Sequence, residues 1–294
     1  MTSTILISKP ISVRVLLNYL FKNFLISLFA IFILWALALT YIYFLPNYYS
    51  SNLVVTAVKS DSESLSSQAG GLAALAGFNM DSSSEKEKKV AFSIIKSKKF
   101  ISSFIDKNML AEVLFAGIAY DDSTNKIIYD TEKLKYYSDN SHSLAVKKLL
   151  IDKFVEALYI EEDSRTSTIS ISFFTVSPIL ARDVPQKIVD EINDIMRTDA
   201  LEETERSIIF LESELETNPN VSVKLSLGTI LEKQLEKKIL NEVRTDYFFK
   251  TIDPTVLPYE PTKPRKLRYS LLAFIAIFIL VQTLFTLRYI IREA

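Results

Sequence analysis

The sequence predicts an α+β domain that contains a long helical hairpin and is flanked by two transmembrane helices. Three observations lead to this fold class: an uncharged apolar run near each end, a period-two apolar pattern in the middle, and a long helix-favouring stretch interrupted by Asn218-Pro219-Asn220. The chain has 294 residues, of which 49% are hydrophobic and 23% are charged. It is therefore too apolar for an ordinary soluble protein and too charged to lie wholly in lipid.

Two segments are expected to cross a membrane. Residues 24–45 contain no charged residue, and a helix of this length reaches roughly 33 Å against a bilayer core of about 30 Å. Residues 269–287 form a second uncharged run of spanning length. The Ala36-Leu37-Ala38 sequence leaves a cleavable signal peptide as an alternative for the first run. A cut there would fall inside the apolar stretch, so a retained anchor is favoured.

The basic residues predict the orientation. Lys9, Arg14 and Lys22 precede the first span, and the next basic residue after it is Lys59. The positive-inside rule then places 1–23 and the tail 288–294 in the cytoplasm and 46–268 in the periplasm of a bacterial inner membrane. Four basic residues before the second span favour the opposite orientation. The first span usually dominates topology and is given more weight.

The first part of the domain is expected to hold one strand and then helices. Residues 50–58 are β-branched and resemble a strand, and the small residues of 67–80 are expected to form a loop. Ser82 and Glu85 have the spacing of a capping box, so helices are expected to fill 85–108.

The second part is expected to hold a helix at 143–154 and then two strands joined by a polar turn. Ile169, Ile171 and Phe173 alternate with serines, which indicates a strand with one apolar face. Ser177-Pro178 has the sequence of a helix start, and helix-favouring sequence continues to about Thr217. That helix would extend about 60 Å.

A return helix is expected at about 222–250, because the helical pattern resumes after Asn218-Pro219-Asn220. Such a hairpin can be a local antiparallel coiled coil without a further role, or its flanks can be buried by neighbouring copies of the chain. For the return helix, the residues expected on one face are Leu227, Leu231, Leu235, Val243 and Tyr247. For the long helix, the residues expected to contact other copies are Ile188, Ile192, Ile195, Ile208, Leu211 and Leu215.

A proline-rich segment, 253–265, precedes the second span. The stretch "TIDPTVLP" (251–258), which overlaps its start, is expected to pair at a sheet edge with the strand at 50–58. The expected membrane-entry residues are Pro254, Pro258, Pro261, Pro264 and Arg265. The last three prolines recur every three residues, the period of a polyproline helix, which predicts a stiff strut. The alternative is a spacer that merely joins the domain to its anchor.

Residue chemistry indicates neither an enzyme nor a cofactor or metal site. The chain has one histidine, His142, in a polar stretch, and it has no cysteine. Acidic pairs such as Glu161-Glu162 are expected to be solvated, and no phosphate-binding loop sequence occurs. Residues 46–268 carry 29 Lys and Arg against 34 Asp and Glu, a net charge of −5, which disfavours nucleic-acid binding.

Several stretches together resemble the Wzz-type chain-length determinants, the polysaccharide co-polymerases. These stretches are "GLAALAG" (71–77), "IIKSKKFISSFIDKN" (94–108), "ERSIIFLESEL" (205–215), "LEKQLEKKILNEVRTDYFFKTIDP" (231–254) and the proline run. The resemblance implies a non-catalytic inner-membrane protein that forms ring-like homo-oligomers. It also implies that the protein acts with a Wzy-type polymerase on nascent lipid-linked polysaccharide, to regulate O-antigen chain length in lipopolysaccharide. Two alternatives are a capsule or exopolysaccharide export adaptor and a two-span ligand sensor that relays to a separate kinase.

Overall fold

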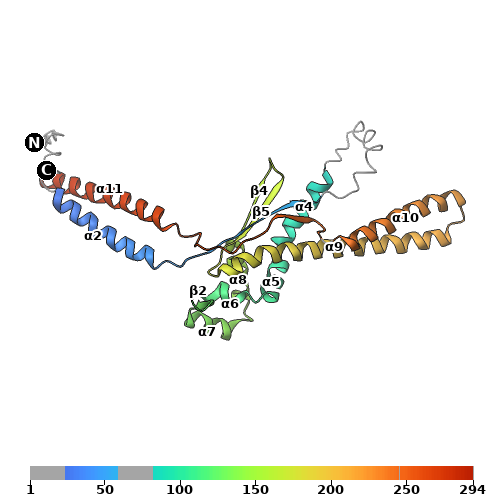
Figure 1. The fold of residues 1–294 in the computed structure, drawn as a ribbon, viewed down its shortest axis with the longest axis horizontal. Coiled ribbons are helices and arrows are strands. Elements are labelled where there is room, and N and C mark those ends of the chain that lie inside the picture. The colour runs from blue at the N-terminus through green and yellow to red at the C-terminus, as the bar shows by residue number, and fades with distance from the viewer. Residues whose placement is uncertain (1–23, 59–81, 245, 294) are drawn as a thin grey trace, which may run out of the picture. The chain divides into compact units, whose positions relative to one another are not determined.

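The computed structural model describes residues 24–58, 82–244 and 246–293 (Figure 1). The chain divides into two compact units. One unit is Tyr48–Pro261, and the other is formed by the two ends of the chain, up to Asn47 and from Thr262. The small-residue stretch expected to form a loop, 67–80, lies outside the described residues.

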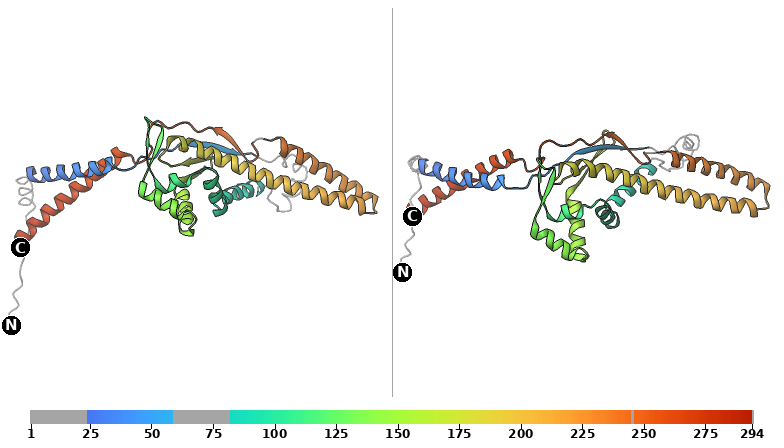
Figure 2. Two further views of the ribbon diagram at one scale, coloured as in Figure 1. Left: turned by 90° about the horizontal axis from the view of Figure 1, so that it is seen from below. Right: turned by 60° about the horizontal axis from the view of Figure 1, so that its bottom comes forward.

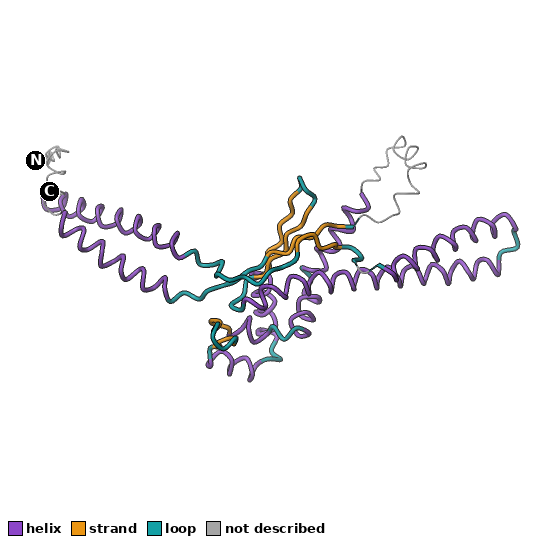
Figure 3. Tube along the Cα trace, in the orientation of Figure 1, coloured by secondary structure: helices purple, strands orange, loops and turns teal. Residues whose placement is uncertain are grey.

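A four-stranded antiparallel sheet is the centre of the Tyr48–Pro261 unit (Figure 3). Its strands, in spatial order, are β4 (Leu158–Asp163), β5 (Thr168–Phe173), β1 (Asn52–Ala57) and β6 (Phe249–Asp253). Each pair of neighbours is antiparallel. The sheet therefore joins segments from both ends of the unit, and β4 and β6 are its edges.

The sheet has one apolar face, because apolar residues alternate with polar ones along its strands. On β5, Ile169, Ile171 and Phe173 are buried, which confirms the strand expected there. On β1, Leu53 and Val55 lie opposite Ile171 and Ile169 and are also buried. The N-terminal half of the long helix packs against this face and completes the core.

Smaller elements cover the rest of the core. They are α4 (Ser82–Ile95), α5 (Lys98–Lys107), α6 (Ala111–Ala116), the hairpin of β2 (Gly117–Asp121) and β3 (Lys126–Tyr129), α7 (Thr131–Asn140) and α8 (Leu144–Ala157). Aromatic rings connect them to the sheet: Phe104 lies 5.7 Å from Phe154, which lies 5.2 Å from Phe173. These helices therefore share one hydrophobic core with β5.

One detail of the helices at 82–107 differs from expectation. Ser82 is the first residue of α4, whereas a capping box would place it at the N-cap, just before the helix. Two helices fill the range expected for helices, 85–108, with a break between them. At Ser97 the backbone is extended, and the Ser97 side chain accepts a hydrogen bond from the Phe100 N–H at 3.2 Å. A new N-cap thus separates α4 from α5.

The long helix α9 spans Pro178–Thr217, the range expected from its start and break signals. Ser177 caps it by accepting from the Leu180 N–H at 3.4 Å. Asn220 caps the return helix α10 (Val221–Val243), which lies beside α9 in each view of Figure 2. The two form the expected hairpin, so the predicted fold class is confirmed.

The return helix is shorter than the expected 222–250. It ends at Val243, where Arg244 is extended. Phe248 and Phe249 then bury their rings in the core, 4.7 Å apart, and Phe249 begins β6. Burial of two aromatic side chains outweighs the weak helical pattern of this stretch. The expected edge pairing with the first strand is present, with Val55 opposite Thr251, and it begins earlier, with Ala57 opposite Phe249.

The unit formed by the chain ends holds two helices that are long and apolar enough to cross a membrane. They are α2 (Phe24–Tyr43) and α11 (Lys266–Glu293), which begins three residues before the expected span. Only 11% and 6% of their most apolar windows is buried, which argues against core helices of a soluble protein. The indole N–H of Trp35 donates to the Ser270 carbonyl at 3.3 Å, and its ring packs edge-on against Phe274, so the two helices contact each other.

Candidate assembly site

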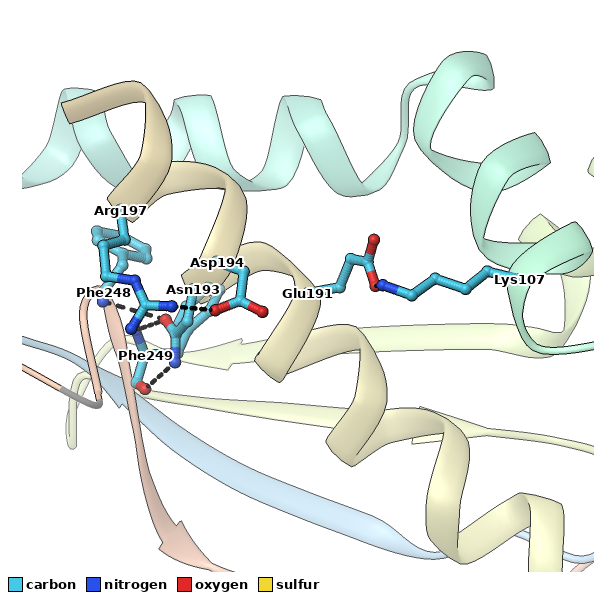
Figure 4. Close-up of polar contacts among 7 residues, drawn as sticks. All are labelled: Lys107, Glu191, Asn193, Asp194, Arg197, Phe248 and Phe249. Atoms are coloured by element: carbon cyan, nitrogen blue, oxygen red, sulfur yellow. Dashed lines mark hydrogen bonds and ion pairs between the residues drawn. The ribbon is translucent and has the colours of Figure 1, made fainter. Parts of the chain in front are cut away.

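Asn193, in the N-terminal half of α9, forms hydrogen bonds with the start of β6 (Figure 4). Its side-chain oxygen accepts from the N–H groups of Phe248 at 3.1 Å and Phe249 at 2.7 Å. Its side-chain nitrogen donates to the Phe249 carbonyl at 2.9 Å. Asn193 is only 6% exposed, and these three bonds satisfy an amide that would otherwise be costly to bury.

Ion pairs flank this amide on the solvent side of α9. Arg197 bonds Asp194 at 2.7 Å, and Lys107 of α5 bonds Glu191 at 2.5 Å (Figure 4). The hydrogen bond to Glu191 raises the pKa of Lys107 above its ordinary value. Because exposed pairs of this kind contribute little, the buried amide is the stronger connection.

The hairpin has its own buried seam. Ile208 and Leu211 of α9 are each 6% exposed, and Thr204 of α9 and Asn241 of α10 are also buried. Lys238 of α10 forms an ion pair with Glu205 of α9 at the rim. The hairpin is therefore held by contacts within one chain.

Titratable groups of α4, of α10 and of the segment that follows α10 interact with one another. Burial raises the pKa of Glu87, and the charge of Lys237 on α10 partly opposes this. Burial also raises the pKa of Tyr247, with a further contribution from the charge of Glu87. The carboxyl of Glu87 is thus held in surroundings that disfavour its charged form.

The structure gives most of the expected oligomer contacts on α9 a different role. Ile188 and Ile192 are fully buried against the sheet, and Ile195 packs against the same core. Ile208 and Leu211 are buried in the hairpin seam, which leaves only Leu215 half-buried. Ile188, Ile192 and Ile195 share one face of α9, and Ile208, Leu211 and Leu215 share a roughly opposite face. The protomer itself covers most of both faces.

Other apolar residues remain exposed on the hairpin. On α9, Ile209 and Phe210 point away from the seam, and Phe210 is 62% exposed. On α10, five exposed apolar residues recur at helical spacing: Val221, Leu225, Leu235, Ile239 and Val243. Part of this stripe borders a shallow groove of about 480 Å³ that begins at Gly228.

The expected face of the return helix is therefore corrected. Leu227 and Leu231 are half-buried, Leu235 and Val243 are exposed, and Tyr247 lies beyond the end of α10. A test of the spacing from Val221 onward would have found the exposed stripe. The sequence alone gives no sign that α10 ends before Tyr247.

The proline-rich residues lie in a segment without helix or regular strand. Pro254, Pro258 and Pro261 follow β6, and Pro264 and Arg265 immediately precede α11. The Val256 N–H donates to the Ser51 side chain at 3.0 Å, which fixes the first part of the segment beside the start of β1. A role for these residues in length control stays a prediction.

The residues considered for chemistry are dispersed in the structure. His142 is exposed in the turn before α8. The acidic pair Glu161-Glu162 lies on β4, where Glu162 forms an ion pair with Lys88 at 2.6 Å. Among the described residues, no group of three or more His, Cys, Asp or Glu side chains is placed to hold a metal ion.

The comparison with solved structures finds matches of low sequence identity. One of them, described as a full-length bacterial polysaccharide co-polymerase, is 11% identical over 96% of this chain and 98% of that chain, with a TM-score of 0.39. A TM-score of this size does not establish a common fold. A search of curated proteins finds no match.

The family comparison is more specific. The family model described as "Wzz: Chain length determinant protein" matches residues 9–108, roughly a third of the chain. The match includes α2, β1 and α4, and it ends just after α5. The expected resemblance to the Wzz-type chain-length determinants is confirmed over these residues.

Proposed function

We propose that the chain is a non-enzymatic regulator of O-antigen chain length that acts by modulating a Wzy-type polymerase. The observation that carries this proposal is the match of residues 9–108 to the chain length determinant family. The same residues contain the first membrane helix, the central strand β1 and the helices that cover the core. The match therefore concerns both the anchor and the domain.

The anchors support a two-pass protein of the bacterial inner membrane. Both candidate spans are long enough to cross the bilayer, and the unit between them holds most of the described chain. In the proposed topology both termini are cytoplasmic and Tyr48–Pro261 is periplasmic, as the basic residues before the first span favour. Reporter fusions at the exposed β2–β3 turn and at the C-terminus test this topology.

Exposed apolar residues on the hairpin support a mechanism that depends on self-association. A hairpin with exposed apolar residues on both helices is typical of a surface that other protein covers. We propose that copies of the chain assemble into a ring in the membrane and contact the polymerase and its lipid-linked glycan. Such an assembly would alter how long the polymerase stays on one chain, without forming or breaking bonds itself.

Deletion of the gene tests the proposal. In wild-type cells the lipopolysaccharide ladder on a gel is expected to cluster around one length. In the deletion strain the ladder is expected to decline steadily with length, and a plasmid copy is expected to restore the cluster. An unchanged ladder would refute the proposed function.

A further inference from the structure

The central sheet has two open edges, one on β4 and one on β6. Among the strands that the structure describes, each of these two has a hydrogen-bonded neighbour on one side only. Edge strands present unpaired N–H and C=O groups, which can pair with a strand of another chain. The two edges belong to the same sheet, so copies of the chain can meet edge to edge.

On β4, the main-chain hydrogen bonds to β5 determine which groups face the open edge. The Ala157 carbonyl accepts from the Phe174 N–H at 2.8 Å, and β4 continues from this pair in an unbroken register. Because hydrogen-bonding direction alternates along an antiparallel strand, the main-chain groups of Tyr159 and Glu161 face β5. Those of Ile160 face outward.

On β6, the same reasoning identifies Thr251. The Phe248 carbonyl accepts from the Val58 N–H at 2.7 Å, so Phe249 and Thr251 face away from β1. Asn193 already occupies the outward groups of Phe249. Among the described residues, no hydrogen bond from outside the ladder reaches Thr251 or Ile160.

We propose that β4 of one copy pairs with β6 of a second copy, antiparallel, with Ile160 opposite Thr251. This inference rests on the self-association in the proposed function and adds to the hairpin a second contact surface, at the edges of the sheet. The register places Tyr159 beside Ile252 and Glu161 beside Lys250, all on the polar outer face of the sheet. An apolar pair and an opposite-charge pair across strands both stabilise a sheet.

The strand directions are compatible with a repeating assembly. β4 is antiparallel to β5, β5 to β1 and β1 to β6, so a following β4 in the same orientation continues the alternation. Each copy uses a different edge toward each neighbour. Such a head-to-tail contact closes into a ring when the rotation between copies divides a full turn.

Neighbouring registers are blocked. A shift of two residues toward the start of β6 would place Ile160 opposite Phe249, whose outward groups are taken by Asn193. A shift the other way would place it opposite Asp253, which a bulge pairs with Val54 of β1. That shift would also place Glu161 beside Ile252. The amide and the bulge therefore leave one register open.

Cysteine cross-linking tests the contact, because the natural chain contains no cysteine. The full-length chain with Tyr159→Cys and Ile252→Cys is oxidised in native membranes and run on a non-reducing gel. Directly opposite residues of a non-hydrogen-bonded pair lie close to disulfide range. We expect dimers, trimers and larger species.

Matched controls define the strand and the register. The control pair is Ser172→Cys with Ile252→Cys. Ser172 lies directly opposite Tyr159 on β5, so its thiol is on the same face of the sheet and at the same position along it, but one strand farther from the edge. We expect no ladder of species from this pair, and none from either single variant of the test pair. A ladder from the Ser172 pair as strong as that from the Tyr159 pair would contradict the proposed register.

Charge exchange tests the pair at Glu161 and Lys250 in the cross-linking background. Glu161→Lys and Lys250→Glu are each expected to lower the yield of cross-linked species about threefold, since a cross-strand charge pair contributes less than about 1 kcal/mol. The two changes together are expected to restore the yield. A combined variant that is weaker than either single variant would overturn the pairing.

The outcome is separable from that of the proposed function. A clear ladder of cross-linked species in a protein whose deletion leaves glycan length unchanged would support the contact and refute length control. Oligomers seen by light scattering without any Tyr159 to Ile252 cross-link would refute the contact and leave length control standing.

Discussion

The side-chain amide of Asn193 pairs with both main-chain groups of Phe249. Its nitrogen donates to the carbonyl at 2.9 Å and its oxygen accepts from the N–H at 2.7 Å. A neighbouring strand would supply the same hydrogen-bond pattern, but in this protein a helix residue 56 positions earlier in the chain supplies it. The long helix thereby holds the strand that leads into the proline-rich segment.

Removal of this amide should destabilise the protein. Asn193→Ala leaves the Phe249 N–H and carbonyl without their buried partner, so the free energy of unfolding should fall by roughly 1 to 3 kcal/mol. Chemical denaturation of the full chain in detergent, followed by circular dichroism, measures this change.

Two further variants serve as controls. Asn193→Asp keeps the acceptor but turns a carboxylate oxygen toward the Phe249 carbonyl, so it should be at least as destabilising as alanine. Asn140→Ala removes an amide that bonds the Tyr136 carbonyl at the surface, and it should change stability by less than about 0.5 kcal/mol. Equal effects of Asn193→Ala and Asn140→Ala would mean that the junction is not important for stability.

The hairpin seam should depend on Leu211 and not on its exposed neighbour. Leu211→Ala opens a cavity between α9 and α10 and should cost roughly 2 kcal/mol, while Phe210→Ala removes an exposed ring and should leave the fold intact. Hydrogen exchange of the α10 amides distinguishes them, since faster exchange is expected for Leu211→Ala only. Faster exchange in both variants would mean that the exposed face also holds the hairpin together.

Glu87 should make stability depend on pH. Its raised pKa means that the folded state binds the proton more tightly than the unfolded state, so stability is highest below the ordinary pKa of 4.5 and falls as the pH rises through the raised value. Glu87→Gln removes this loss and should raise Tm at pH 7 but not at pH 4. Melting curves at both pH values measure the effect, and an equal shift at both would refute it.

The proline-rich segment should control glycan length separately from folding. Replacement of Pro258, Pro261 and Pro264 together with alanine frees the backbone of this segment without altering the core. The lipopolysaccharide ladder should then lose its clustered lengths, while circular dichroism of the purified variant stays unchanged. A retained cluster would show that the segment is only a spacer.

Much of the architecture could be predicted because its signals are local. Ile169, Ile171 and Phe173 alternate with serines, and a two-residue period is sufficient to identify β5. Ser177-Pro178 and Asn218-Pro219-Asn220 mark the ends of α9 through the chemistry of capping and the missing N–H of proline.

The candidate site could be predicted only in part, because its partners are distant in sequence. The apolar residues of α9 could be named from the sequence, but whether the sheet, α10 or another chain covers Ile188 and Leu211 depends on tertiary packing. The role of Asn193 requires Phe249, and the end of α10 requires the burial of Phe248. No local pattern contains either contact.

Reconstitution tests the central claim most directly. Liposomes that hold a Wzy-type polymerase and lipid-linked repeat units are prepared with and without this protein, and the number of repeat units per glycan is measured by gel electrophoresis. The account predicts a distribution that narrows around one length when the protein is present, and no polymer from the protein without the polymerase. The same steadily declining distribution in both preparations would contradict it.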